Sequence, residues 1–407
     1  MLYIELAWRN LFRNTRRTLL TCLLISTGLA VLIFADGVIR GMEKLMIGSV
    51  TKTLQGEAQI NRLGFRDNFD VDLYIENPTK ILGKLAEDER LSAYSLRVLS
   101  GGMIGSAYNS AGGVIYGINP EQEKEVSRIR DAISEGNYLS GKSRELLIGT
   151  TLADLLEVKL GDRIVLTAAN ADTNELTQDL FRISGIFEFG AREFDEGFVF
   201  VNLSAAQKLL GMEGEIHQIV LQFKDPETSR DNLSLSYQGL EDKEIEITGW
   251  LGLQPSIGAM LEYTNLGTAI IGGILFILIS LGVINSLFMS IYERIYEFGV
   301  IRAIGTSRFE IISLVLVEAF FLGLLSAFLG LIVGLMFNYY YSINGLPLGE
   351  MEVSGIMLGN GNLYTEVAPY QVIFLPFYVI LLTLVTAIYP AFFASRIVPT
   401  RALQRAL

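Results

Sequence analysis

The sequence predicts a membrane protein with four transmembrane α-helices and a large α+β domain inserted between the first and second helix. Half of the 407 residues are apolar and the mean hydropathy is +0.40, which is high for a soluble protein. Four apolar stretches reach the roughly 20 residues that a helix needs to cross the hydrocarbon core. One polar block of about 220 residues separates the first stretch from the others, which is enough chain for one or two domains. The predicted spans are 19–39, 266–290, 311–337 and 371–393.

The N-terminal segment, residues 1–18, is amphipathic at helical spacing, with Ile4, Trp8, Leu11 and Phe12 on one face and arginines on the others. This pattern predicts a helix that lies in the cytoplasmic interface of the membrane. A plain soluble start, whose arginines only set the topology, remains an alternative. Span 19–39 is too long for a signal peptide and has no small-x-small cleavage site, so it is interpreted as an uncleaved anchor.

Lysine and arginine in the short loops predict the orientation, because cationic loops stay on the cytoplasmic side. They occur in residues 1–18, in the loop 291–310 and in the tail 394–407, whereas the loop 338–370 has none. Both termini and the 291–310 loop are therefore expected in the cytoplasm, and the 40–262 domain outside. Residues 41–262 hold 21 Lys and Arg against 35 Asp and Glu, a net charge of −14, which argues against nucleic acid as a partner.

The external domain 40–262 alternates strand-like and helix-like runs, which indicates an α+β class. The expected strands are 57–63, 98–107, 113–117, 163–168, 180–187, 198–201, 218–223 and 244–248. The expected helices are 79–88, 122–134, 149–156, 204–210 and 227–237.

Residues 136–143, GNYLSGKS, match the phosphate-binding loop G-x-x-x-x-G-K-[ST] literally. That chemistry needs a strand before the loop and a helix after it. Here the preceding SRIRDAISE has a helical pattern and the following ELLIG an extended one, so the nucleotide site is rejected. The only histidine, His217, and the only cysteine, Cys22, each stand alone, so neither a metal site, a catalytic triad nor an intrachain disulfide is expected.

Glu318 lies about two turns into the third span, where a carboxylate costs about 2–3 kcal/mol unless it finds a partner or water. It is expected to face the bundle interior, either as part of the moving machinery or in a structural hydrogen bond near Asn285 or Ser286. Asp36 is close enough to the outer interface to be hydrated. Small residues at four-residue spacing predict close helix contacts, within the chain or between two copies. They are Gly282, Ser286 and Ser290 in the second span and Ser326, Gly330 and Gly334 in the third.

The cytoplasmic loop 291–310 is much longer than a turn requires. Within YERIYEFGVIRAIGTSRFEI, the apolar residues Ile295, Phe298, Ile301 and Ile304 recur at three-residue steps, and Gly305 is placed to end a helix. A short amphipathic helix of this kind suits docking to another protein. A solvated loop that only sets the topology is the alternative.

Seven stretches of the chain, in order, resemble the MacB/FtsX-like ABC transporter permeases, most closely the Lol lipoprotein-releasing permeases of the LolC/LolE type. The stretches are AWRNLFRNTRRTLLT, GGVIYGINPEQE, ELLIGTTLADLLEVKLGDRIVL, ISGIFEFG with DEGFVFVNLSAAQKLLG, ERIYEFGVIRAIGTSRFEI, LVEAFFLGLLSAFLGLIVG and YPAFFASRIVPTRAL.

The resemblance implies a non-catalytic permease of the inner membrane with a MacB-like periplasmic core domain. It implies a LolD-like cytoplasmic ATPase that carries ATP and Mg²⁺, with no cofactor on this chain. It also implies a second permease copy or paralogue, a lipoprotein substrate released towards a LolA-like carrier, and no nucleic acid. By the same resemblance, the ATPase-coupling motif comprises Glu293, Glu297, Gly299, Arg302 and Gly305.

Two other functions fit the same scaffold. One is export of a peptide or small amphiphile, and the other is an FtsX-like regulator that transports nothing and switches a periplasmic enzyme. The sequence leaves open whether the permease forms a homodimer or a heterodimer, because both types share these motifs.

Overall fold

The computed structural model describes residues 7, 9–10, 13–190, 192–230, 244–347, 352–353, 356–357 and 362–398. The chain divides into two compact units. The helical unit comprises residues 1–43, 261–348 and 362–407, and the sheet unit comprises residues 44–260 and 349–361. Of the predicted N-terminal amphipathic face, Ile4, Trp8, Leu11 and Phe12 lie outside the described residues.

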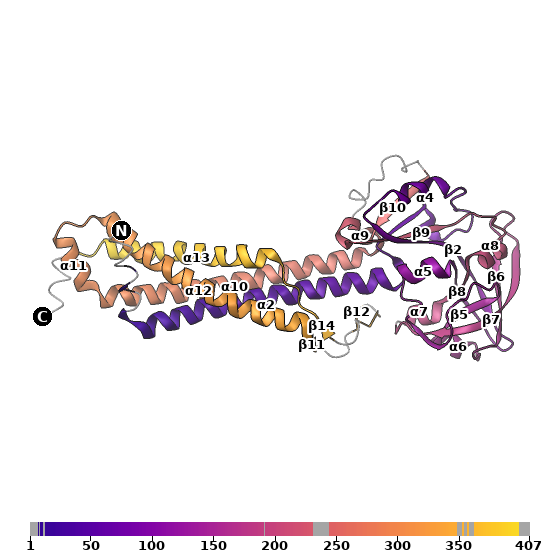
Figure 1. Ribbon diagram of the computed structural model, residues 1–407, viewed down its shortest axis with the longest axis horizontal. Helices are drawn as coiled ribbons and strands as arrows, with labels where there is room; N and C mark the ends of the chain where they lie inside the picture. The colour runs from indigo at the N-terminus through magenta and orange to yellow at the C-terminus, as the bar shows by residue number, and fades with distance from the viewer. Residues whose placement is uncertain are drawn as a thin grey trace. The chain divides into compact units, whose positions relative to one another are not determined.

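Four helices are long and apolar enough to cross a membrane, as the sequence predicts (Figure 1). Each begins before and ends after its predicted span, because hydropathy marks only the part that lies in hydrocarbon. The four are α2 (Thr15–Val50), α10 (Pro255–Glu293), α12 (Arg308–Asn344) and α13 (Pro369–Ser395), with the short α11 (Ile295–Ala303) between α10 and α12. Two small antiparallel pairs join β11 (Leu346–Pro347) to β14 (Asn362–Leu363) and β12 (Glu352–Val353) to β13 (Ile356–Met357).

The small residues of α10 and α12 pack against α2 within the same chain. A Cβ on Gly330 would lie 2.6 Å from the Ser26 carbonyl oxygen, and one on Gly334 would lie 3.0 Å from the Cα of Ala30. On α10, Gly282 leaves room for the Leu24 side chain. The structure thus fills both predicted small-residue faces with an intrachain partner, since close backbone approach gives the dispersion contacts that hold helices together in lipid.

The sheet unit contains one ten-stranded sheet, and all eight predicted strands are present. The prediction missed β4 as a strand and listed β5 only as an extended run. The strands are β1 (Ala58–Arg62), β2 (Leu91–Gly105), β3 (Ser110–Ile118), β4 (Ile133–Gly136), β5 (Glu145–Gly149), β6 (Arg163–Ala169), β7 (Leu176–Phe187), β8 (Phe198–Asn202), β9 (Gln218–Phe223) and β10 (Ile245–Gly249).

The strand order is β10-β1-β9-β2-β3-β8-β5-β7-β4, and β6 pairs with both β2 and β7. The pairs β2–β3–β8–β5–β7–β6–β2 therefore form a closed ring of six strands, while β9, β1 and β10 extend from β2 as an open sheet. The long strand β2 changes partner from β9 to β6 between Arg97 and Gly102. A Cβ on Gly102 would lie 2.6 Å from the Thr167 carbonyl oxygen, so glycine permits this crossing.

Short helices cover the sheet, and two predicted ones need correction. The predicted helix 122–134 is wrong after Val126. Helix α5 begins at Pro120, after its cap Asn119, and it ends at Val126 because the backbone of Ser127 is extended (φ −129°). The run 227–237 begins in a 3₁₀-helix, and residues 231–243 lie outside the described part of the chain. The helices are α3 (Phe65–Asn68), α4 (Thr79–Ala86), α5 (Pro120–Val126), α6 (Thr150–Leu155), α7 (Arg192–Gly197), α8 (Leu203–Leu210) and α9 (Trp250–Leu253), with a π-helix (Thr51–Gln55) after α2 and the 3₁₀-helix Pro226–Ser229.

Candidate coupling site

The loop between the second and third spans folds as the short helix α11, which confirms the helical interpretation of this insert. Arg294 leaves helical geometry (φ −109°, ψ 15°) and separates α11 from α10. Gly305 has φ +110°, a value that glycine adopts readily, and it follows the last turn of α11 as predicted. Ser307 and Glu310 then form a capping box that starts α12.

A cluster of charged side chains joins this loop to the beginning of α2. Arg17 Nη1 donates to Glu293 Oε2 at 2.6 Å, and Asn14 Nδ2 donates to the same oxygen at 3.1 Å. Arg13 forms a second ion pair with Glu297. Both acidic residues of the predicted coupling motif therefore pair with the N-terminal segment of the same chain.

Glu318 faces the bundle interior, as predicted, with a side chain that is 9% exposed. Arg294 Nη1 donates to Glu318 Oε2 at 3.0 Å, and Ser290 Oγ donates to Oε1 at 3.4 Å. Its partners are thus Ser290 and Arg294 rather than Asn285 or Ser286. This pairing explains how a carboxylate persists at that depth.

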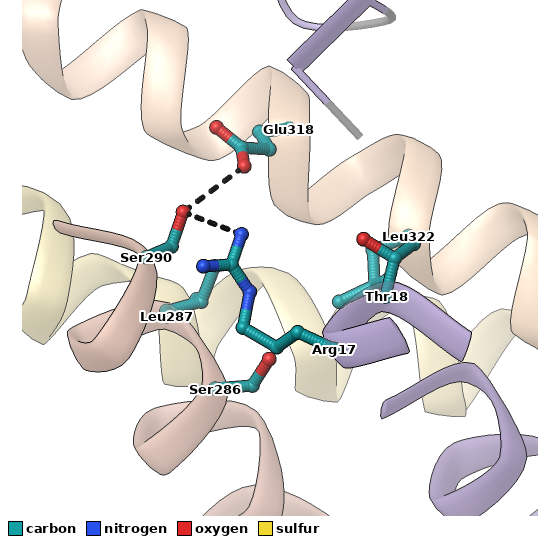
Figure 2. Close-up of a pocket in the computed structure, with 7 residues that line it drawn as sticks. All are labelled: Arg17, Thr18, Ser286, Leu287, Ser290, Glu318 and Leu322. Carbon is teal, nitrogen blue, oxygen red and sulfur yellow. Dashed lines mark hydrogen bonds between the residues drawn. The ribbon is translucent and has the colours of Figure 1, made fainter. Parts of the chain in front are cut away.

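Figure 2 shows that the Ser290 hydroxyl forms hydrogen bonds with both Arg17 and Glu318. The Arg17 Nη2 to Ser290 Oγ distance is 3.0 Å. A polar cavity of about 20 Å³, the size of one water molecule, lies between these groups. We call Arg13, Arg17, Ser290, Glu293, Arg294, Glu297 and Glu318 the charged cluster.

The surroundings of Glu297 shift the pKa of its carboxyl. Burial acts to raise the pKa of this carboxyl, but hydrogen bonds and charge attraction from Arg13 and Arg294 outweigh it and lower the pKa below its usual value. Arg294 Nε lies 3.1 Å from Glu297 Oε2. Glu297 is therefore ionised at neutral pH and held on two sides by arginines.

The other three predicted coupling residues have different surroundings. Gly299 is buried, and Gly305 is exposed after the end of α11. Arg302 Nη1 donates to the Ser395 carbonyl oxygen at 2.8 Å, which ties α11 to the end of α13. The most exposed apolar side chains of the loop are Ile304 and Phe309, each 81% exposed. Ile304 belongs to the apolar pattern predicted for the docking helix, whereas Phe309 was not predicted.

Three arginines of this site, Arg13, Arg17 and Arg294, are not recognisable as site residues from the sequence. There they stand out only as charges in the short segments that set the topology. The sequence contains one signal for these pairs. Glu293 and Glu297 lie near Arg294 in the chain, and their negative charges are opposite to those of the arginines in residues 1–18, which are expected on the same side of the membrane.

A second polar cluster corrects the expectation that Asp36 is simply hydrated. Asp36 accepts hydrogen bonds from Tyr370 and, at 2.6 Å, from Gln371 Nε2. Arg40 Nε lies 3.4 Å from the Asp36 carboxylate, and its guanidinium lies 4.4 Å from the centre of the Tyr370 ring. Gln371 also accepts from the buried Asn338 at 3.2 Å. These contacts join α2, α12 and α13.

The structure shows the backbone around the rejected phosphate-loop match, residues 136–143. After Gly136 the chain runs through residues 137–144 without a helix and enters strand β5. The extended interpretation of the following ELLIG is confirmed. The helical interpretation of the preceding residues is wrong, because β4 pairs with β7 there.

His217 is a buried structural residue. Its Nδ1 accepts from the Leu99 amide at 3.1 Å, its Nε2 donates to the Val71 carbonyl at 2.9 Å, and its ring stacks on Phe65. Both ring nitrogens are therefore occupied. Among the described residues, no group of three His, Cys, Asp or Glu side chains could hold a metal ion.

Two buried groups of the sheet unit, His217 and Glu57, act on its stability in opposite directions as the pH changes. Burial lowers the pKa of His217 to about 4, so its contribution to stability is full above pH 6.5 and is lost as the pH falls towards 4. Burial raises the pKa of Glu57 to about 7, so its contribution is full below pH 4.5 and is lost as the pH rises towards 7.

Substituting Glu57→Gln should leave the effect of His217 on the pH dependence of stability unopposed, because glutamine does not titrate. In this variant, relative to the unmodified chain, the free energy of unfolding should increase by about 2 kcal/mol more between pH 4 and 6.5. Denaturant unfolding in detergent, followed by fluorescence of the buried Trp250 in a Trp8→Phe background, measures it. Parallel pH curves for the two proteins would contradict the assignment.

Comparison with known proteins identifies the fold family. Residues 18–231 match the MacB-like periplasmic core domain, which is more than half of the chain, and residues 269–399 match the FtsX-like permease C-terminal domain. The chain belongs to the MacB/FtsX-like permease family. This membership makes it an ABC transporter permease and implies a partner ATPase and dimerisation.

The curated relatives of this permease include lipoprotein-releasing system transmembrane proteins. The LolC protein of Neisseria meningitidis serogroup B is 20% identical over 395 residues, covering 93% of this chain and 92% of its own. LolC of Xylella fastidiosa (strain Temecula1) is 24% identical over 311 residues, 72% of each chain. LolE of Haemophilus influenzae is 21% identical over 303 residues, 71% of this permease and 72% of the relative.

Among solved structures, this permease is similar to the periplasmic region of MacB from Actinobacillus actinomycetemcomitans. The identity is 15% and the TM-score 0.34, over 50% of this chain and 94% of that one. The extracellular domain of the transporter YknZ from Gram-positive bacteria is 12% identical with a TM-score of 0.30, over 42% of this chain and 84% of that one.

Proposed function

We propose that this permease releases lipoproteins from the inner membrane towards a LolA-like periplasmic carrier and the outer membrane. The observation that carries the proposal is the similarity to a lipoprotein-releasing LolC protein along 93% of the chain. In this proposal both termini and α11 are cytoplasmic, and the sheet unit is periplasmic. The arginines near the ends of the spans support that orientation.

The work in this proposal is mechanical. Pulling an acyl chain out of a bilayer costs about 0.8 kcal/mol for each CH₂ group, so release needs an energy source. A separate LolD-like ATPase would supply it by hydrolysing ATP with Mg²⁺, while this chain performs no catalysis. The helix α11 and its flanking residues would receive the ATPase, with Ile304 and Phe309 as exposed apolar anchors and the Glu293, Glu297, Gly299, Arg302 and Gly305 motif shaping the loop.

An acidic substitution of either anchor should disrupt the complex with the ATPase. In Ile304→Asp and Phe309→Asp, the affinity of the permease for the ATPase should fall by about 30-fold, because a buried apolar anchor contributes about 2 kcal/mol or more to an interface. Titration of the ATPase onto nanodisc-embedded permease measures the affinity. Tyr108→Asp, at a 74% exposed residue of the sheet unit, is the matched control. Unchanged affinity in both loop variants would reject these anchors.

Reversing the charge of Glu297 should uncouple hydrolysis from transport. Glu297→Lys places a third cation beside Arg13 and Arg294, so the loop loses the two ion pairs of Glu297 while its exposed anchors remain. We expect ATP hydrolysis without release, measured as lipoprotein transferred per ATP consumed. Glu196→Lys breaks the exposed pair with Arg192 in the sheet unit and is the control. Wild-type release by Glu297→Lys would count against the coupling assignment.

Depletion in cells tests the function itself. Loss of this permease should leave outer-membrane lipoproteins in the inner membrane, measured by membrane fractionation. Normal lipoprotein sorting would overturn the proposal. In that case, accumulation of a peptide or amphiphile would favour an exporter, and loss of a cell-wall hydrolase activity would favour an FtsX-like regulator.

A further inference from the structure

The charged cluster connects α2 with three helices that lie far from it in the sequence but follow one another directly. The helices α10, α11 and α12 follow one another directly, so a displacement of α11 reaches its two neighbours through the backbone. Helix α2 has no such connection, because Asn14 and Arg17 are separated from Glu293 by 279 and 276 residues. Only non-covalent contacts can pass a movement of α11 to the beginning of α2.

The contacts that do so are ionic and directional. Arg17 binds Glu293 and Ser290, and Arg13 binds Glu297 on α11 itself. One turn further along α2, Thr21 and Ser286 share a hydrogen bond of 2.6 Å. A guanidinium held by a carboxylate and a hydroxyl resists being pulled away in several directions, whereas apolar helix faces can slide past one another.

The Arg17 side chain is also linked to the second ion pair of the cluster. It is 17% exposed, and through Ser290 it is in hydrogen-bond contact with the buried pair of Arg294 and Glu318. Residues from α2, from the end of α10 and from α12 therefore meet at one hydroxyl (Figure 2). Any movement of the α10–α11 junction changes the geometry around Arg17.

We infer that Arg13 and Arg17 are positioning residues that latch α2 to the coupling loop and make α2 move with α11. From α2 the chain continues through residues Thr51–Gln55 into strand β1, so the latched helix is the one by which the chain enters the sheet unit, and α10 is the helix by which it leaves. The inference rests on the proposed function, because it names the path by which the ATPase stroke leaves the loop.

Charge reversal tests the latch in the reconstituted complex of permease and ATPase. Arg17→Glu and Glu293→Arg alone should each lower the lipoprotein released per ATP hydrolysed by about tenfold, the scale of a typical coupling between sites. Combining the two substitutions restores an opposite-charge pair and should recover most of the release. Arg192→Glu, in the exposed pair with Glu196, is the matched control and should change nothing. A double variant as poor as the single ones overturns the latch.

A distance measurement tests the latch without any substrate. Spin labels at Leu20→Cys on α2 and Ala303→Cys on α11, in a Cys22→Ala background, should keep one distance in the nucleotide-free and ATP-bound complexes. The same labels should separate on ATP binding when Glu293→Gln removes the ion pair while leaving the N-terminal arginines in place. An unchanged distance in that variant overturns the inference. A complex in which the wild-type chain binds no ATPase or releases no lipoprotein instead contradicts the proposed function.

Discussion

Replacing Arg97 with methionine should lower the free energy of unfolding of the sheet unit by about 3–5 kcal/mol, because it leaves the buried carboxylate of Glu123 without its partner. Arg97 and Glu123 are 1% and 0% exposed and form a bidentate ion pair, with Arg97 Nε 3.1 Å from Glu123 Oε2. Ser95 Oγ donates to the same carboxylate at 2.7 Å. Denaturant unfolding of the full chain, followed by Trp250 fluorescence, measures the loss.

The pH dependence of this variant gives a second, independent result. Burial acts to raise the pKa of Glu123, but the charge and hydrogen bonds of Arg97 outweigh it and hold the pKa below its usual value. Without Arg97 only the hydrogen bonds of Ser95 and Ser127 oppose the effect of burial, and the carboxyl can escape the cost of burial by taking up a proton. The destabilisation should therefore be largest at neutral pH and shrink as the pH falls.

Two further variants keep the prediction falsifiable. Arg97→Met combined with Glu123→Met removes both charges and should recover part of the lost stability, since an apolar pair of similar size leaves no buried charge. Arg192→Met removes an 83% exposed partner and should cost less than about 1 kcal/mol. Equal losses in Arg97→Met and Arg192→Met would show that burial of the pair has no energetic consequence.

Replacing Arg294 with methionine should destabilise the helical unit by a similar amount. The side chain of Arg294 is 10% exposed and binds both Glu318 and Glu297, so its loss leaves Glu318 buried with Ser290 as a neutral partner. We expect a cost of about 3 kcal/mol and a melting temperature lower by roughly 5–10 °C in detergent. Thermal unfolding of the purified permease measures it.

The rescue and the control for this prediction follow from the same contacts. Adding Glu318→Gln to Arg294→Met replaces the stranded carboxylate with a neutral amide and should recover most of the melting temperature. Arg302→Met removes a single hydrogen bond to the Ser395 carbonyl and should have a smaller effect. A double variant that melts no higher than Arg294→Met would contradict the buried ion pair as the cause.

Local patterns in the sequence determined the elements of this permease. Apolar runs of sufficient length located the four spanning helices, and alternation located eight of the ten strands of the sheet. The glycine at position 305 and the three-residue apolar steps before it predicted α11 and its end. These features depend on residues within one or two turns of each other, so they can be recognised without knowing the fold.

Where local patterns compete, the sequence misled. Residues 128–134 have the apolar spacing of a helix, yet the chain there turns and forms β4, because pairing with β7 overrides a weak local preference. The closing of six strands into a ring was likewise not visible. It depends on β6 pairing with both β2 and β7, and strand partners are chosen by the whole sheet rather than by either strand alone.

Only the tertiary structure decided which charges meet. The sequence showed arginines near the N-terminus, glutamates in the loop and one carboxylate in the third span, but not that Arg17 binds Glu293 or that Arg294 binds Glu318. A lone buried charge is costly, which predicts that a partner exists but not which one it is. The partner is set by how α2, α10 and α12 pack, and those helices meet only when residues far apart in the chain have folded together.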